Sequence, residues 1–184
     1  MKGRLFVISG SSGVGKGTVI KAFLAKHPEF KLSVSCTTRS PRGGEIHGEH
    51  YFFITKEEFI SCRERGEFLE WAEFSGNMYG TQKAYVERKL SEGKNLILEI
   101  DTQGALKVKK VMPEATLIFI LPPSLEELEA RLRGRHTETE EAIQKRLNSI
   151  KMEMENSKSF DCQVVNDSVE NAVKKLEEIC IKKG

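Results

Sequence analysis

The stretch that most constrains this chain runs from Leu5 to Thr18 and reads LFVISGSSGVGKGT. It begins with a short apolar segment, Leu5 to Ile8, and continues through a glycine-rich turn into a helix-forming segment. Gly10 is followed by four residues and then by Gly15 and Lys16, which is the spacing of a P-loop. Because this turn follows a strand of the buried type and precedes a helix, a purely structural glycine-rich turn is the weaker interpretation.

The needs of a phosphate chain explain this spacing. Glycines let the backbone bend into a nest of N–H groups and approach the phosphates closely. The start of the next helix adds free N–H groups and the positive end of its dipole. Lys16 then supplies a point charge to the terminal phosphates. The residues predicted to bind the phosphate chain are Gly10, Ser11, Ser12, Gly13, Val14, Gly15, Lys16, Gly17 and Thr18.

One position departs from the P-loop pattern. The motif has Ser or Thr after the lysine to hold Mg²⁺, whereas this chain has Gly17 there and Thr18 next. The sequence therefore predicts a metal contact from Thr18, or one made mostly by waters and phosphates, which Mg²⁺ tolerates well.

Bulk composition indicates one globular domain. The chain has 184 residues, 39% of them hydrophobic and 30% charged, which suits a core of ordinary size. A net charge of +2 does not by itself favour binding to nucleic acid. The sequence has neither a signal-peptide pattern nor an apolar segment long enough for a bilayer. The four cysteines form no C-x-x-C pair, so we expect reduced thiols in a cytoplasmic protein.

Strand and helix patterns alternate along the chain, which predicts an α/β fold with a doubly wound, mostly parallel sheet and helices on both faces. We expect a core over about 1–32, 96–123 and 156–184, an inserted subdomain over about 33–95, and a helical lid over about 124–155. The expected strands are 5–8, 51–54, 68–74, 95–100, 115–121 and 163–166, and the expected helices start near 19, 55, 82, 105, 124, 137 and 167. Thr55 with Glu58, and Thr137 with Glu140, match the capping-box pattern.

Several polar residues outside the P-loop are candidates for a second substrate site. Arg39 and Arg42 flank Pro41, and two guanidinium groups on a constrained turn make an oxyanion clamp. A solvated basic loop is the alternative, but a P-loop enzyme needs a phosphate site for its acceptor. Glu70 lies between apolar neighbours, which suggests a partly enclosed carboxylate. Asp101 follows a buried strand, so it either borders the ligand crevice or caps the next helix.

With these residues in view, the sequence resembles the guanylate kinases along essentially its whole length. The matching blocks are the P-loop, SVSCTTRSPRGGE, GEHYFF, FLEWAEFSGNMYGT, LEIDTQG, RLRGRHTETEEAIQKRL and VVND. A P-loop alone says little about substrate, but these blocks in this order are highly specific.

The resemblance implies Mg²⁺-dependent transfer of a phosphoryl group from ATP to GMP, and dGMP, in purine nucleotide metabolism. It assigns the GMP phosphate to Arg39, Arg42, Tyr51 and Tyr79, and the guanine to Ser35, Glu70, Thr81 and Asp101. A carboxylate accepts from the N1–H and N2–H₂ donors of guanine, which adenine lacks. The residues implied for the charge of the transition state are Lys16, Arg42, Arg131, Arg135 and Arg146, with Arg135, Asn166 and Asp167 beside adenine.

The sequence departs from the family pattern at three positions: Ser11 replaces Pro, Gly17 replaces Ser or Thr, and His136 replaces Gly after the lid arginine. Two alternatives remain. A nucleoside monophosphate kinase of other base specificity would lack the guanine-reading residues, and an inactive protein-binding module of the same family would lose P-loop or lid residues. We expect ATP and GMP as the binding partners, no nucleic acid or membrane, and a monomer or homo-oligomer.

Overall fold

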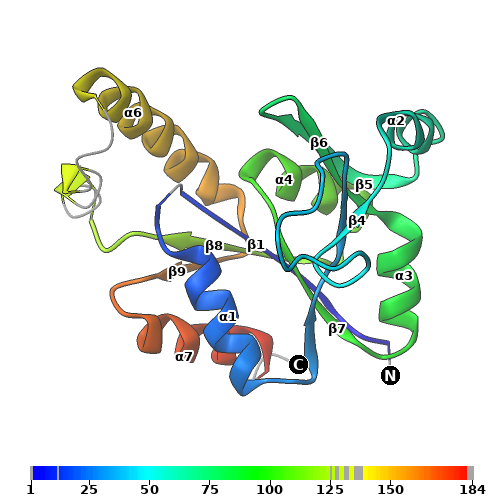
Figure 1. Cartoon of the computed structure of the whole chain (residues 1–184). Coiled ribbons are helices and arrows are strands. Elements are labelled where there is room, and N and C mark those ends of the chain that lie inside the picture. The colour runs from blue at the N-terminus through cyan, green and yellow to red at the C-terminus, as the bar shows by residue number, and fades with distance from the viewer. Residues whose placement is uncertain are drawn as a thin grey trace. The chain divides into compact units, whose positions relative to one another are not determined.

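The computed structural model describes residues 2–11, 13–124, 126, 129–130, 133–134 and 139–181, and the backbone alone of Arg146. Strands and helices alternate along most of these residues (Figure 1). The strands are β1 (Leu5–Gly10), β2 (Phe30–Leu32), β3 (Ser35–Thr37), β4 (Tyr51–Phe53), β5 (Phe68–Phe74), β6 (Asn77–Gln82), β7 (Asn95–Glu99), β8 (Thr116–Leu121) and β9 (Cys162–Val165). The helices are α1 (Lys16–Lys26), α2 (Lys56–Glu64), α3 (Lys83–Ser91), α4 (Thr102–Val111), α6 (Glu140–Asn156) and α7 (Val169–Cys180), with a 3-10 turn at Ser157–Ser159.

The strands form two sheets. The larger has five strands in the order β2-β7-β1-β8-β9, and the pairs β2–β7, β1–β8 and β8–β9 are all parallel. The smaller has four strands in the order β4-β3-β6-β5, with β3 parallel to β4 and antiparallel to β6, and β5 antiparallel to β6. The predicted α/β class with a mostly parallel main sheet is therefore confirmed.

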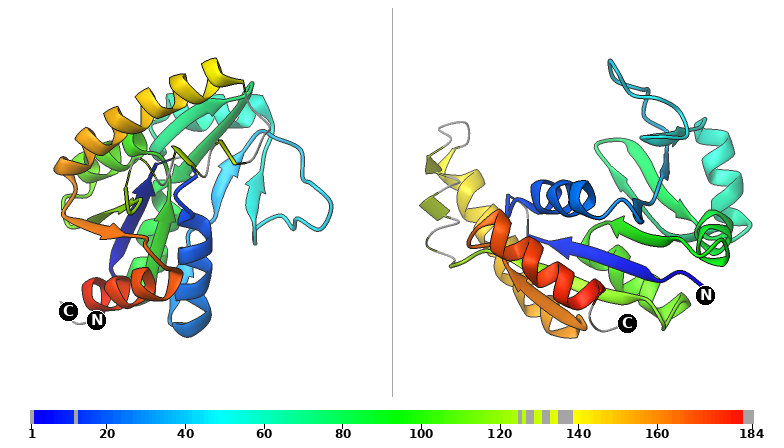
Figure 2. Two further views of the ribbon diagram at one scale, coloured as in Figure 1. Left: turned by 90° about the vertical axis from the view of Figure 1, so that its left-hand side faces the viewer. Right: turned by 90° about the horizontal axis from the view of Figure 1, so that it is seen from below.

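The chain divides into two compact units. Unit 2 contains Phe6–Pro28, Glu99–Thr102 and the chain from Thr116 onward. Its strands β1 and β8 are buried along nearly their whole length, as the continuous apolar segments predict. Helices α1 and α7 pack side by side (Figures 1 and 2). His27, which closes α1, lies 3.0 Å from Glu177 of α7 through its Nε2 atom.

Unit 1 contains Glu29–Leu98, Gln103–Ala115 and the N-terminal residues through Leu5. Its four-stranded sheet packs on α2 through buried Cys36, Phe59 and Met78. Helix α2 begins with the predicted capping box, in which the Thr55 side chain accepts from the Glu58 N–H and the Glu58 carboxylate accepts from the Thr55 N–H.

Several element boundaries differ from the sequence prediction. Helix α1 starts at Lys16 and α4 at Thr102, each three residues earlier than expected, because glycines in their first turns lower the apparent helix propensity and tertiary context overrides it. Strands β2, β3 and β6 were not predicted, and β6 occupies sequence that reads as a glycine-bounded turn over 75–81. The expected N-cap at Thr137 is wrong: Thr139 caps α6 by accepting from the Ala142 N–H at 3.3 Å. Half of the helix expected from Ser124 to about Arg133 falls on residues that the structure does not describe.

None of the helices that the structure describes combines the length and the hydropathy that a bilayer crossing requires.

Candidate active site

In unit 2 the turn between β1 and α1 has the backbone that a P-loop requires. Gly15 is the N-cap of α1 with φ 86°, a left-handed conformation that favours glycine. A Cβ on Gly15 would lie 3.0 Å from Nδ2 of Asn166. A Cβ on Gly10 would lie only 2.7 Å from the carbonyl oxygen of Ile120, so a side chain there would displace strand β8. Both glycines are thus required by conformation and close packing.

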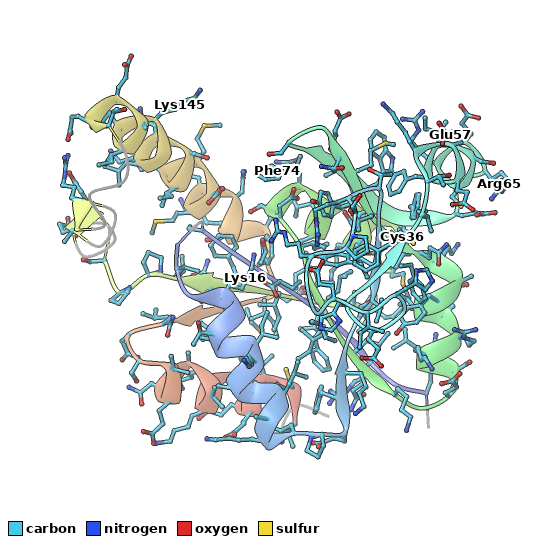
Figure 3. All side chains as sticks on the ribbon, viewed as in Figure 1. Lys16, Cys36, Glu57, Arg65, Phe74 and Lys145 are labelled. Carbon is cyan, nitrogen blue, oxygen red and sulfur yellow. The ribbon has the colours of Figure 1, made fainter. Side chains whose placement is uncertain are left out.

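A cavity of about 330 Å³ opens over this turn. It is lined by Gly10, Ser11, Gly13, Val14, Gly15, Lys16, Gly17 and Glu99. Lys16 lies at the N-terminal end of α1 (Figure 3), and its Nζ is 3.9 Å from Oε1 of Glu99. Because the N-cap is glycine, it has no side-chain oxygen to satisfy the first N–H groups of the helix. A turn of this kind is suited to an anionic ligand at the positive end of the helix dipole.

A second cavity of about 540 Å³ adjoins the P-loop and is lined by Gly13, Val14, Gly15, Thr18, Gly134, Asn166 and Val169. Asn166, immediately after β9, is 7% exposed and donates from Nδ2 to the Val14 carbonyl oxygen at 2.8 Å. This bond braces the P-loop from a point far along the chain. The structure therefore brings Asn166 and Thr18 to the P-loop.

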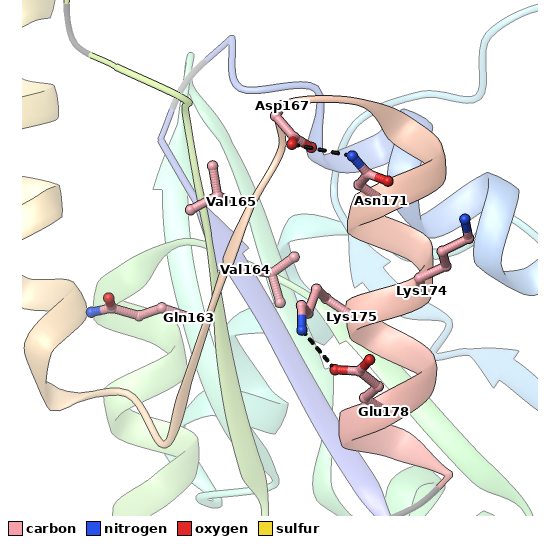
Figure 4. A pocket seen from close by; sticks show the side chains of 8 residues that line it. All are labelled: Gln163, Val164, Val165, Asp167, Asn171, Lys174, Lys175 and Glu178. Atoms are coloured by element: carbon pink, nitrogen blue, oxygen red, sulfur yellow. Dashed lines mark hydrogen bonds and ion pairs between the residues drawn. The ribbon is translucent and has the colours of Figure 1, made fainter.

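Asp167 lines a different pocket, of about 420 Å³, with residues of β9 and α7 (Figure 4). Its carboxylate accepts from the Ser168 N–H at 2.6 Å and from Nδ2 of Asn171 at 3.2 Å. The N-cap of α7 is Ser168, one of the two residues predicted for that role. Asp167 thus makes these hydrogen bonds at the start of α7, and its predicted place beside adenine stays a prediction.

In unit 1 four of the eight residues predicted for GMP lie in one row across the four-stranded sheet. Ser35 on β3 is in register with Tyr51 on β4, and Glu70 on β5 with Thr81 on β6. The Oγ of Ser35 is 3.3 Å from Oγ1 of Thr81, which joins the two pairs. Tyr79 lies two residues from Thr81 and so shares its face of the sheet. The strand period thus places these five side chains together.

The acidic member of this row is enclosed. Glu70 is 7% exposed, and its Oε1 accepts a hydrogen bond from Oγ1 of buried Thr81 at 2.7 Å. A register shift between Phe68 and Glu70 aligns Glu70 with Thr81. Gly80, which precedes Thr81 on β6, packs closely, since a Cβ there would lie 3.0 Å from the rings of Phe59 and Phe68. A buried carboxylate needs donors, and Thr81 supplies one.

An arginine and two tyrosines form the other end of this face. Cζ of Arg39 lies 5.5 Å from the Tyr51 ring centroid, and the Tyr51 and Tyr79 rings meet edge to face at 6.1 Å. Arg39 forms a two-bond ion pair with Glu45, both bonds being 2.9 Å. Hydrogen bonds from Arg39 and then from the Arg42 backbone hold the pKa of Glu45 at about 2, while Glu45 raises the pKa of Arg39.

The remaining predicted residues are placed in part or not at all. Arg42 is exposed, and its backbone N–H donates to Glu45 at 2.7 Å. Asp101 lies between β7 and α4 and is exposed. Ser12, Arg131, Arg135 and the side chain of Arg146 lie outside the described residues, as does His136.

Two carboxylates in these sites carried no role in the sequence analysis. Glu99 lies within buried-strand sequence, and only its place two residues before Asp101 at the carboxyl end of β7 could have singled it out. Glu45 lies three residues after Arg42, a spacing that could have suggested a turn closed by the carboxylate. Over the described residues, no group of three or more His, Cys, Asp or Glu side chains is arranged to hold a metal ion.

Comparisons with known proteins agree on one family. The family model described as Guanylate kinase matches residues 2–183. A guanylate kinase of Prochlorococcus marinus (strain NATL2A) is 50% identical over 175 residues, which cover 95% of this chain and 94% of that protein. A guanylate kinase of Synechocystis sp. is 48% identical over 97% of this chain and 94% of its own length. The crystal structure of guanylate kinase from Anaplasma phagocytophilum is 33% identical with a TM-score of 0.75, and covers 99% of this chain and 86% of its own. On this agreement of site, sequence and fold, the chain belongs to the guanylate kinase family.

Proposed function

We propose that this chain transfers the terminal phosphoryl group of ATP to the phosphate of GMP, giving ADP and GDP, and that it also accepts dGMP. The observation that carries this proposal is the row Ser35–Thr81–Glu70 beside Arg39 and the two tyrosines. Such a face can bind a purine with adjacent donors and a phosphate at the same time. Membership of the guanylate kinase family supports the same reaction.

Guanine matches the row by its hydrogen bonds. The carboxylate of Glu70 would accept from N1–H and N2–H₂ of guanine. A hydroxyl of the Ser35–Thr81 pair would donate to O6. Adenine presents an acceptor at N1, so it would leave the buried carboxylate without donors. Asp101 is proposed as a further acceptor for guanine, and Arg39, Arg42, Tyr51 and Tyr79 as donors to the GMP phosphate.

The P-loop would bind and orient the donor nucleotide. Its N–H groups and Lys16 would hold the β- and γ-phosphates, and Asn166 would keep the turn in place through Val14. Phosphoryl transfer depends mainly on positioning and on neutralising charge, so no strong general base is needed. We propose that the negative charge of the transition state is stabilised by Lys16, Arg42, Arg131, Arg135 and Arg146. Arg135, Asn166 and Asp167 would border the adenine of ATP. Closure of the segments over about 33–95 and 124–155 would exclude water from the reaction.

The residues around the P-loop fit Mg²⁺ held mainly by phosphates and waters. A Cβ on Gly17 would lie 3.8 Å from Oε1 of Glu99, so this carboxylate lies near the place left by the missing Ser or Thr. Thr18 lines the adjoining cavity. We propose that Thr18 and Glu99 bind waters of the metal. A Mg²⁺ ion held there would offset negative charge on the phosphates.

Replacing Glu99 by Gln is expected to raise the Mg²⁺ concentration for half-maximal rate about tenfold, which is the size of effect of outer-shell ligands. Titrations of ATP binding with and without Mg²⁺ check this, because only the binding with Mg²⁺ should weaken. Glu92→Gln, which removes an exposed partner of Lys89, is the matched control. An equal loss of ATP affinity with and without Mg²⁺ would mean that Glu99 affects ATP binding only through its ion pair with Lys16.

The proposed reaction is tested by a coupled phosphotransfer assay with ATP and Mg²⁺, offering GMP, dGMP, AMP, CMP and UMP in parallel. We expect turnover confined to the guanine nucleotides. Turnover of AMP would keep the P-loop assignment and overturn the guanine assignment. Binding of GMP without turnover of any nucleotide would instead indicate a protein-binding module. We further propose a cytoplasmic location.

A further inference from the structure

The loop between β3 and β4 contains a carboxylate that is bonded to both predicted phosphate-binding arginines. Glu45 accepts from Nη1 and Nη2 of Arg39 at 2.9 Å each, and from the backbone N–H of Arg42 at 2.7 Å. The Glu45 N–H donates in return to the Arg42 carbonyl oxygen at 3.0 Å, which closes the turn. Only 15% of the Arg39 side chain and 19% of the Glu45 side chain are exposed.

The negative charge of Glu45 is by itself unfavourable in a site that binds phosphate. Its pKa of about 2 keeps it ionised at neutral pH, where it repels a phosphate dianion and offsets the charge of Arg39. If it acted only through its charge, its removal would tighten GMP binding. A benefit that outweighs this repulsion therefore has to come from geometry.

The geometry provides such a benefit. The two bonds from Glu45 fix the plane of the Arg39 guanidinium, and Nη1 donates further to the Ser40 carbonyl oxygen at 2.8 Å. The same plane lies over the rings of Tyr51 and Phe53, with Cζ 5.5 and 5.8 Å from their centroids. A guanidinium held in this way binds an anion without the entropy cost of ordering a long side chain.

Another ion pair of unit 1, between Arg65 and Glu67, lacks these features. Arg65 and Glu67 also form a two-bond pair, at 2.6 and 3.0 Å, but their side chains are 55% and 44% exposed. The Arg65 side chain also donates hydrogen bonds to Ser61 and Cys62 of α2, neither of which is predicted to bind a ligand. Exposed ion pairs of this kind contribute little to the stability of a protein. The pair therefore serves as a matched control.

We propose that Glu45 is a positioning residue that pre-orders Arg39 and the Arg42 turn for the phosphate of GMP. The proposal rests on the proposed function of the same site. It assigns to Glu45 no contact with the substrate, and it predicts that the loss of a negative charge weakens the binding of an anion.

The test is calorimetric binding of GMP and of guanosine to the wild type, Glu45→Gln and Glu45→Asp, together with steady-state kinetics. For Glu45→Gln we expect GMP affinity to fall and KM for GMP to rise about tenfold or more, in line with the cost of small misplacements. Guanosine binding, KM for ATP and the melting temperature should stay near wild type. Glu45→Asp keeps the charge on a shorter arm and should restore part of the loss. Glu67→Gln should change none of these values.

Unchanged or tighter GMP binding by Glu45→Gln would overturn the proposal, and so would equal losses for GMP and guanosine, which indicate a structural role alone. An Asp variant as weak as the Gln variant would also contradict it. The proposed function fails separately, if the wild type binds GMP without phosphorylating it. The comparison of GMP with guanosine still tests Glu45 in that case.

Discussion

Replacing Lys16 by Met is expected to reduce phosphoryl transfer on the order of 10³-fold, the lower end of what a cation on the transferring group contributes. Lys16 begins α1 at the edge of the P-loop cavity, and its ammonium group has Glu99 at 3.9 Å as a partner. We propose that this charge faces the phosphate oxygens on which negative charge develops. Methionine keeps most of the apolar stem and removes the charge, so the loss should appear in kcat rather than in KM for GMP.

The fold should survive this change, because Lys16 is partly exposed and its ion pair with Glu99 is long. We expect the free energy of unfolding to change by no more than about 0.5 kcal/mol, as at other surface positions. Lys21→Met, at an exposed position of the same helix, is the control and should retain activity. Near-normal turnover by Lys16→Met, measured with saturating ATP, would contradict the assignment of the P-loop.

The sequence predicted most reliably what depends on local pattern. The strand and helix on either side of the glycine-rich turn, the buried strands of the main sheet and the Thr55 capping box are each set by residues close together in the chain, and each is confirmed. The first and last residues of the helices and strands were predicted less accurately. Helix α1 begins before two residues of low helix propensity, Gly17 and Thr18, since its first turn is held by the P-loop and not by propensity.

The sites were harder to predict because they depend on strand register. Ser35 lies on a strand of only three residues that the sequence did not indicate, yet its pairing with β4 and β6 aligns Tyr51, Thr81 and Glu70. No local pattern contains a register shift such as the one before Glu70. Glu99 was missed because its partner Lys16 is far from it in the chain. Glu45 was missed although its partners Arg39 and Arg42 are close in the chain, because no motif specifies the conformation of their loop.

Replacing Glu70 by Gln is expected to lower kcat/KM for GMP on the order of 10³-fold, as the loss of two hydrogen bonds to a charged acceptor implies. Glutamine retains the shape and still accepts from Thr81, but its NH₂ group faces the N1–H of guanine. AMP should be used no less well than by the wild type. The ratio of GMP to AMP turnover should therefore narrow by nearly the same factor, and parallel assays with the two nucleotides measure it.

Two further variants distinguish the loss of guanine recognition from a general effect of changing strand β5. Glu73 lies on the same strand and is exposed, so Glu73→Gln removes one carboxylate from β5 and should leave the preference intact. Glu70→Ala should narrow the preference as well, but it also leaves the buried Thr81 hydroxyl without its acceptor, at a cost of about 1–3 kcal/mol in stability. An unchanged GMP to AMP ratio in Glu70→Gln would remove Glu70 from guanine recognition. The buried bond between Glu70 and Thr81 would then only hold the sheet together, and selection for guanine would have to come from the other proposed residues, Ser35, Thr81 and Asp101.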